Sequence, residues 1–112
     1  VMAYGTMGGE GQPQTQSAII SRYAMFGQPL HEAITRPRWL LGKTWGDNTT
    51  SLKIEDTAPP ALVASLRDAG PEVELIPAYS SLAGHAGAVV RHPDGRTEAA
   101  TDPRSDGWAF AA

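Results

Sequence analysis

The sequence predicts an α+β domain in which short strands pack against helices. Segments with strand-like and helix-like periodicity follow one another in the order strand, helix, helix, strand, helix, strand, hairpin, and this order favours layered packing. Hydrophobic residues make up 41% and charged residues 19% of the 112 positions, a globular composition. Glycine (12) and proline (9) are abundant, so turns are frequent and elements short. We expect about five strands and three helices in a single domain covering residues 1–112.

The first part of the chain is expected to form a strand and two helices. Residues 1–4 have strand character and lead into a glycine-rich turn at 5–9. Pro13 suits the first turn of the helix that follows, and Gly27 suits its end. Its apolar stripe is Ile19, Tyr23 and Phe26, widened by Ile20 and Met25. A second helix is expected from Pro29 through Ile34, ending before Pro37.

The second part is expected to hold four strands and one helix. Residues 38–50 mix aromatic and turn residues, which predicts irregular structure. The expected strands cover residues 51–55, 73–76, 86–91 and 96–100. Pro59 and Pro60 open the helix between the first two of them, and Gly70 ends it, with Leu62, Val63, Leu66 and Ala69 on one face. The last two strands form a hairpin around Asp94-Gly95. These elements make one sheet covered on one face, so its other face needs a partner.

Composition excludes several classes of function. The net charge of −3 and the nine scattered Lys and Arg residues give no surface for nucleic acid. No apolar run approaches the roughly 18 residues of a membrane span. The absence of cysteine excludes disulfides, thiolate zinc sites and a cysteine nucleophile. The three histidines are not spaced as paired ligands, so we expect no metal.

The segment Tyr4–Gln16, YGTMGGEGQPQTQ, carries the chemical information. Consecutive glycines allow positive φ and close backbone approach, and a helix N-terminus presents unpaired N–H groups with partial positive charge. Together they favour an anion or a developing oxyanion. The segment fits neither the phosphate-binding P-loop nor the dinucleotide-binding pattern. From the residues alone, a glycine turn without a ligand stays open as an alternative.

Four ordered segments resemble the γ-glutamyltranspeptidase family. Gly5–Glu10 resembles its G-[ST]-x-G-G-[SDE] motif, and Ala33–Arg38 its A-[IV]-x-x-P-R motif. Leu66–Gly70, after a strand at 52–55, is similar to the family's L-x-x-x-G helix end, and Thr101–Gly107 to its A-x-D-P-R-x-D-G ending. The stretch Gln12–Gln16 resembles a bacterial sub-branch that includes enzymes hydrolysing small amides such as oxamate.

The resemblance implies a fold, a reaction and a role for two glycines. The fold is a fragment of the four-layer αββα sandwich of N-terminal-nucleophile hydrolases, here the C-terminal portion of the small catalytic subunit. The precursor cleaves itself before a threonine, whose hydroxyl then attacks the amide. The backbone N–H groups of Gly8 and Gly9 hold the oxyanion. The implied activity is transfer of a γ-glutamyl group from an amide such as glutathione to water or an amine, in glutathione metabolism and without a cofactor.

The chain also departs from a complete family member. Val1 has no nucleophilic oxygen, and Thr6 precedes the glycines and is not the catalytic threonine. The family's substrate-gripping serine pair lies upstream of its glycines, so Ser80-Ser81 is not equated with it. We therefore expect the chain to be inactive alone and to need the remainder of its precursor. Gly84 and His85 are expected to line the cleft of the complete enzyme.

Other candidate residues have structural interpretations. A triad of Ser80 or Ser81 with His85 and Asp94 lacks a nucleophile elbow, so the serines are expected to form a turn. Trp39 and Trp45 are expected to cover the edge of the core in preference to marking an interface. We expect structural ion pairs from the charged residues around the second helix and near the end of the chain, namely Arg36, Arg38, Asp102, Arg104 and Asp106.

Two functional alternatives stay open. One keeps the superfamily but moves the substrate to a small amide or a β-lactam side chain. The other is a non-catalytic interaction or oligomerisation module. In either case exposed strand edges and an uncovered sheet face favour self-association of the isolated chain as a homodimer. The sequence assigns no localisation.

Overall fold

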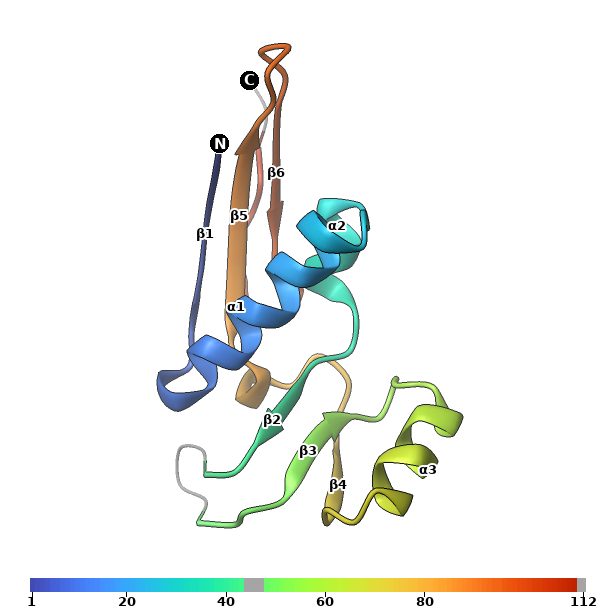
Figure 1. The fold of residues 1–112 in the computed structure, drawn as a ribbon. Helices are drawn as coiled ribbons and strands as arrows, with labels where there is room; N and C mark the ends of the chain where they lie inside the picture. Colours follow the sequence, from blue (N-terminus) through green and yellow to red (C-terminus); the bar gives the residue numbers. More distant parts are fainter. Residues whose placement is uncertain (44–47, 111–112) are drawn as a thin grey trace.

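The structure, a computed structural model, describes residues 1–43 and 48–110, which form two three-stranded sheets (Figure 1). The first sheet has the order β1-β5-β6, from β1 (Met2–Met7), β5 (His85–Arg91) and β6 (Thr97–Thr101), and is antiparallel throughout. The second has the order β2-β3-β4, from β2 (Trp39–Leu41), β3 (Leu52–Glu55) and β4 (Val73–Ile76). Its β2–β3 pair is antiparallel and its β3–β4 pair parallel. The fold is elongated, with extents of 46 × 28 × 19 Å.

Three α-helices accompany the sheets in the described part of the chain. They are α1 (Gln12–Ile20), α2 (Leu30–Thr35) and α3 (Pro60–Asp68). A π turn, η2 (Ser21–Met25), continues α1, and two 3₁₀ turns, η1 (Gly9–Gly11) and η3 (Ser81–Ala83), precede α1 and β5. Helices α1 and α2 lie on one face of the first sheet, whereas α3 packs beside β4 in the second (Figure 1). The α+β class and the three helices are confirmed, and none of these helices is long and apolar enough to cross a bilayer.

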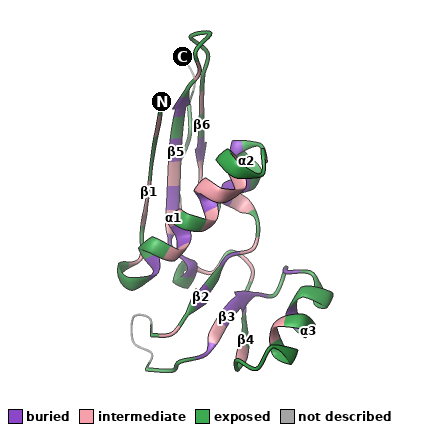
Figure 2. Cartoon of the chain, in the orientation of Figure 1, coloured by how far each residue is buried: buried purple, intermediate pink, exposed green. Residues whose placement is uncertain are grey.

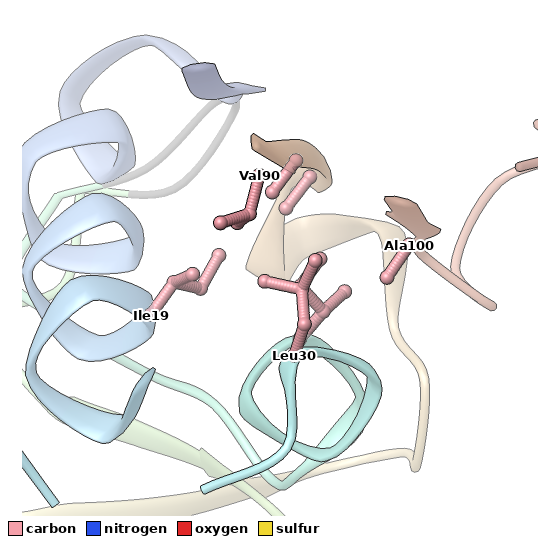
Figure 3. Close-up of a cluster of buried hydrophobic side chains, with 7 residues drawn as sticks. Ile19, Leu30, Val90 and Ala100 are labelled. Carbon is pink, nitrogen blue, oxygen red and sulfur yellow. The ribbon is translucent and has the colours of Figure 1, made fainter. Parts of the chain in front are cut away.

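The main hydrophobic core lies between the first sheet and helices α1 and α2. Figure 3 shows Ile19 of α1 and Leu30 of α2 pointing towards Val90 of β5 and Ala100 of β6. Alternate β5 residues are buried because successive side chains of a strand point to opposite faces. The full buried cluster is Ile19, Leu30, Ile34, Ala86, Ala88, Val90 and Ala100.

The second sheet has a smaller apolar core. Its buried cluster consists of Ile54, Ala58 and Val63, with Leu66 and Val73 partly buried beside them. Most of α3 is exposed (Figure 2). The apolar face expected for this helix therefore buries one residue fully, and Leu62 instead lines an open apolar groove with Trp39. Trp39 is 37% exposed at this groove, consistent with its expected place at the edge of the core. Trp45 lies outside the described residues.

The expected number of strands, about five, is close to the observed number, but the expectation of a single sheet is wrong. The described residues contain six strands in two sheets, because β2 forms within the segment expected to be irregular. Three residues are too few for a periodic signal, and β2 exists because its backbone pairs with β3. The first strand is also longer than expected. It continues to Met7 since Gly5 and Thr6 pair with Gly87 and Ala86 of β5.

Two side-chain expectations are also corrected. Phe26 is 74% exposed and Met25 similarly so, although both were placed on the apolar stripe of the first helix. The π turn accounts for this, because the N–H of Phe26 bonds the carbonyl of Ser21, five residues back, and the wider turn shifts the helical phase. In β3, Lys53 and Glu55 are buried, although the alternation of polar and apolar residues over 51–55 is typical of a strand with one face in solvent.

Candidate functional site: the glycine turn at the end of the first sheet

The glycine turn joins β1 to α1 in a conformation that favours glycine. Gly8 has φ 139° and Gly9 has φ 53°, both in the region that side-chain-bearing residues rarely adopt. The N–H of Gly11 bonds the carbonyl of Gly8 at 3.0 Å and closes the turn just before α1 begins. The first N–H groups of a helix lack intrahelical partners, so this end of α1 is electropositive. The turn thus has the geometry and the local field for an anion or an oxyanion.

Gly84 packs directly against this turn. It is buried with φ 81°, and a Cβ atom built on Gly8 would lie 3.5 Å from its Cα. A Cβ atom on Gly84 itself would come within 2.6 Å of the Met7 carbonyl oxygen and 2.8 Å of the Thr6 hydroxyl. Because backbone cannot yield at such distances, the position accepts only glycine. The structure therefore brings Gly8 and Gly84 together, although 76 positions separate them (84 − 8).

His85 lies next to Gly84 and opposite Met7 in the β1–β5 ladder. Residues directly opposite in an antiparallel pair share a face, so both side chains point away from α1 and α2. The imidazole is partly buried, and its Nε2 atom has no hydrogen-bond partner among the described residues. The four residues singled out from the sequence, Gly8, Gly9, Gly84 and His85, thus lie at one end of the first sheet.

Among the described residues, no helix covers the face of the first sheet that His85 shares. It presents mainly small residues, and a shallow groove of about 460 Å³ runs over Gly5, Gly87, Val89 and Ala99 beside Trp108. Val89 is exposed, and a Cβ atom on Gly5 would meet nothing within 4 Å. The glycine turn follows β1 directly, at the end of this open apolar face.

A buried network of four charged side chains supports Gly84 from the other side. Its members come from the start of β2, from β3 and from the segment after β6: Arg38, Glu55, Asp102 and Arg104. Arg104 donates from Nε to Glu55 at 2.7 Å and from Nη1 to Asp102 at 3.0 Å. Arg38 pairs with Asp102 through Nη2, which also donates to the carbonyl oxygen of Gly84 at 3.2 Å. The network therefore ties both sheets to the residue beside the glycine turn.

The two arginines of the network differ in how many of their guanidinium nitrogens have a hydrogen-bond acceptor. Every guanidinium nitrogen of Arg104 donates a hydrogen bond, and three of its acceptors are the carbonyls that end α2, those of Ile34, Thr35 and Arg36. Burial disfavours its charge, but the bonds to Glu55 and Asp102 outweigh burial and raise the pKa of Arg104. Arg38 is 1% exposed, and its Nε and Nη1 have no partner among the described residues. Burial accordingly lowers the pKa of Arg38, with the Asp102 carboxylate opposing the shift.

The carboxylates of the network also hold backbone N–H groups. Asp102 accepts from the N–H of Ala86 at 2.8 Å, and Glu55 accepts from the N–H of Arg38 at 3.0 Å. The guanidinium of Arg104 lies 5.5 Å from the ring centre of Tyr79, a residue held at φ 55°. Each charge in the network therefore fixes a segment of backbone as well as a partner side chain.

Most sequence-based expectations for the charged residues are confirmed. Asp102, Arg104 and Arg38 are structural ion pairs, and Arg36 forms an exposed pair with Glu32 at 3.2 Å. Asp106 is exposed and lies outside the network. Sequence reasoning missed Glu55. Its only signal was charge balance, since two buried arginines with Asp102 alone would leave one positive charge unpaired.

The serine–histidine–aspartate triad is excluded by geometry. Asp94 lies in the hairpin turn beyond the far end of β5, whereas His85 begins that strand. At about 3.4 Å per residue, the strand separates the two by roughly 20 Å. The hydroxyl of Ser80 accepts from the N–H of Leu82 at 3.3 Å, as expected for a serine that caps a turn.

Comparison with known proteins agrees with the fold. The family model for γ-glutamyltranspeptidase matches residues 1–112. The chain is 58% identical over 109 residues to an oxamate amidohydrolase proenzyme of Klebsiella pneumoniae, covering 97% of this chain and 21% of that protein. It is 42% identical over 106 residues to a glutathione hydrolase-like proenzyme of Bacillus subtilis, covering 95% of this chain and 20% of that protein.

Solved structures place the same fold within larger chains. A γ-glutamyltranspeptidase from Pseudomonas nitroreducens superposes with a TM-score of 0.79 at 20% identity, covering 99% of this chain and 55% of that chain. A cephalosporin acylase from Bacillus halodurans superposes with a TM-score of 0.81 at 26% identity, covering 96% of this chain and 20% of that chain. The α+β layers are thus a fragment of the N-terminal-nucleophile hydrolase architecture. The chain belongs to the γ-glutamyltranspeptidase family, and it spans about a fifth of the length of the proenzymes it matches.

Proposed function

We propose that the complete protein is a self-processing amidohydrolase or acyltransferase in which Gly8 and Gly9 form the oxyanion hole. The observation that carries this proposal is the glycine turn itself, held at positive φ at the N-terminal end of α1 and at the end of an open sheet face. Backbone N–H groups fixed at such a position stabilise the negative charge that develops on an attacked carbonyl oxygen. Membership of a family whose relatives are proenzymes supports the same reading.

The reaction divides between this chain and the remainder of the precursor. A threonine outside this chain adds its hydroxyl oxygen to the amide carbon, and its α-amine takes the proton. The carbonyl oxygen then carries the negative charge, and the N–H groups of Gly8 and Gly9 donate to it. When the intermediate collapses, the C–N bond breaks and the α-ammonium returns its proton to the leaving amine. Water or a second amine then attacks the acyl-threonine ester, gives up a proton to the α-amine, and takes the acyl group as the threonine hydroxyl is regenerated. The chain alone is therefore inactive, since Val1 and Thr6 do not supply this nucleophile.

The first substrate class is a γ-glutamyl amide such as glutathione, which is split or transferred in the family's typical reaction. Gly84 and His85 are proposed to line the cleft near the scissile bond, because they flank the glycine turn and His85 faces the open side of the sheet. The Nε2 atom of His85 is buried and has no hydrogen-bond partner among the described residues, so we expect the side chain to change rotamer before it can bond a polar substrate group.

A small amide such as oxamate is a second candidate with its own support. The identity to the oxamate amidohydrolase proenzyme is 58%, against 42% to the glutathione hydrolase-like proenzyme. The segment Gln12–Gln16, directly after the glycine turn, had already suggested that sub-branch. A β-lactam side chain is a third option, supported by the structural likeness to the cephalosporin acylase.

The test is kinetic and uses the complete gene product. Replacing Gly8 by alanine forces a Cβ into a conformation at φ 139° that strongly favours glycine and turns the N–H groups away. We expect kcat with oxamate and with a γ-glutamyl anilide to fall by about 10²–10³, as for loss of one oxyanion donor. A matched Gly95→Ala substitution in the hairpin, also at positive φ but remote from the turn, should leave kcat within twofold. Equal effects of the two substitutions would remove the oxyanion-hole assignment.

The open sheet face and the strand edges lead to a proposal for the isolated chain. In the complete protein, the remainder of the precursor covers the small-residue face; without it, two copies of the chain pair as a homodimer. Light scattering during size-exclusion chromatography measures this directly. A monomer at high concentration would contradict self-association.

The alternative function, a non-catalytic interaction module, predicts that the complete protein hydrolyses no amide.

A further inference from the structure

The first turn of α1 is joined to the second sheet by the side chain of Gln14. Its Nε2 donates to the carbonyl of Leu41 at 3.1 Å, and its Oε1 accepts from the N–H of Leu41 at 2.7 Å. The neighbouring Gly42 bonds inward to Ser51 beside β3, so the backbone groups of Leu41 point to the free edge of β2. The amide of Gln14 thus occupies the place of a neighbouring strand.

The next residue, Thr15, joins the same turn to the loop before β5. Its side chain is 2% exposed, and its hydroxyl donates to the carbonyl of Ala83 at 3.3 Å. A Cβ atom on the adjacent Gly84 would lie 3.7 Å from this hydroxyl. Gln14 and Thr15 therefore connect one helical turn to the edge strand β2 of the second sheet and to the turn that precedes β5 of the first.

At the start of the helix, Gly11 packs closely against Leu40 of β2. A Cβ atom on Gly11 would approach the Cδ2 atom of Leu40 to 2.7 Å, so β2 packs against bare backbone there. The segment between β1 and α1 contains three glycines, at positions 8, 9 and 11, and glycine leaves a backbone free to adopt many conformations. The position of such a segment must be set by contacts at its ends.

We propose that Gln14 and Thr15 are positioning residues that fix the direction of the Gly8 and Gly9 N–H groups by clamping α1 between the two sheets. This inference rests on the proposed oxyanion role of the glycines. Neither side chain touches substrate. Their loss leaves substrate binding intact and lets the turn move away from the charge that forms only in the transition state, so the effect falls on kcat and not on KM.

The experiment compares isosteric substitutions in the complete gene product. Gln14→Met and Thr15→Val remove the hydrogen bonds while preserving size, and Gln12→Met changes an exposed residue of the same turn. We expect the Gln14→Met/Thr15→Val double variant to lower kcat by about tenfold with KM unchanged within twofold. Amide hydrogen exchange of residues 8–11 should accelerate by a similar factor, with no change in β6. Thr15→Ser, which keeps the hydroxyl, should restore the Thr15→Val loss.

Three results would overturn the proposal. One is a double variant with the kcat and the exchange rates of Gln12→Met. Another is faster exchange throughout the first sheet, which indicates general destabilisation and no specific clamp. The third is a rise in KM matching the fall in kcat/KM. If the unsubstituted protein hydrolyses no amide, the proposed function fails by itself, and the exchange of residues 8–11 still decides whether the clamp exists.

Discussion

The two sheets are held together by different kinds of interaction. The first buries seven apolar residues in one cluster between its strands and the helices α1 and α2 (Figure 3). The second has a buried apolar cluster of three residues, and β3 at its centre also buries the charged Lys53 and Glu55. Stability in the first sheet therefore comes from apolar surface removed from water. In the second it depends on ion pairs and hydrogen bonds that reach across to the first.

The two kinds of interaction differ in how strictly they fix the positions of the atoms involved. Apolar contacts are not directional, and a core tolerates changes that preserve its volume. A buried guanidinium bonded to two carboxylates and to helix-end carbonyls has a narrow set of allowed positions. The charged network lies where the two sheets meet, and it ends on Gly84 beside the glycine turn. Directional bonds therefore fix the backbone beside the glycine turn.

The largest effect is expected at Arg104. Replacing it by methionine leaves the buried carboxylates of Glu55 and Asp102 without their main partner, and breaking such a network from one side costs about 3–5 kcal/mol. Urea titration should show this loss in the free energy of unfolding. Arg36→Met, which breaks an exposed pair, is the matched control and should cost less than about 1 kcal/mol. Similar losses from both would remove the distinction between the buried and surface pairs.

The next effect tests the apolar core. Ile19 is fully buried between α1 and β5, so Ile19→Ala should reduce the free energy of unfolding by about 2–5 kcal/mol through lost burial and a residual cavity. Unlike the Arg104 substitution, it leaves no charge unpaired, so its effect should not change with salt concentration. A strong salt dependence would argue against a purely apolar contribution.

A smaller loss is expected in the second sheet. Val63 is buried in a cluster of only three residues and borders a groove open to solvent. Because water or neighbouring side chains can fill the space, Val63→Ala should cost about 1 kcal/mol, below the Ile19 substitution. Thermal unfolding followed by circular dichroism measures both. A larger loss at Val63 would show that the second core is stronger than its size indicates.

The smallest effect distinguishes the observed π turn from a regular helix. Phe26 is 74% exposed, so Phe26→Ser should change the free energy of unfolding by no more than about 0.5 kcal/mol. The apolar stripe expected from the sequence would instead predict a loss of about 3 kcal/mol or more. Unfolding of the purified chain at several urea concentrations separates the two outcomes.

The sequence predicted elements whose ends are set locally. Pro13, Gly27, Gly70 and the Asp94-Gly95 turn all act through sterics of their own backbone, and each lies where the structure begins or ends an element. What it missed depends on residues distant in the chain. Glu55 is buried because Arg38 and Arg104 reach it, and β2 forms because β3 is beside it. Neither pairing leaves a periodic signal.

The sequence likewise predicted some residues of the candidate site and missed others. Gly8 and Gly9 were found from a motif, and Gly84 and His85 from their position before a core strand; the fold places all four together. Their catalytic roles stay predictions. The sequence indicated Gln14 only as a member of the Gln12–Gln16 stretch. Its hydrogen-bond partner is the backbone of Leu41, and because backbone groups are the same in every residue, the sequence does not reveal this pairing. Sequence alone therefore located the turn but not what holds it.

The charged network also determines when the glycine turn can acquire its final shape. Asp102 and Arg104 are made long after Gly8, and at translation rates of 5–20 residues per second they leave the ribosome roughly 5–20 s later. Until then Arg38 lacks its carboxylate partner and Gly84 is not yet held in place. Between the synthesis of Gly8 and that of Arg104, the nascent chain therefore lacks the contacts that hold Gly84 beside the glycine turn. These contacts can form only after the segment Asp102-Pro103-Arg104 has been synthesised.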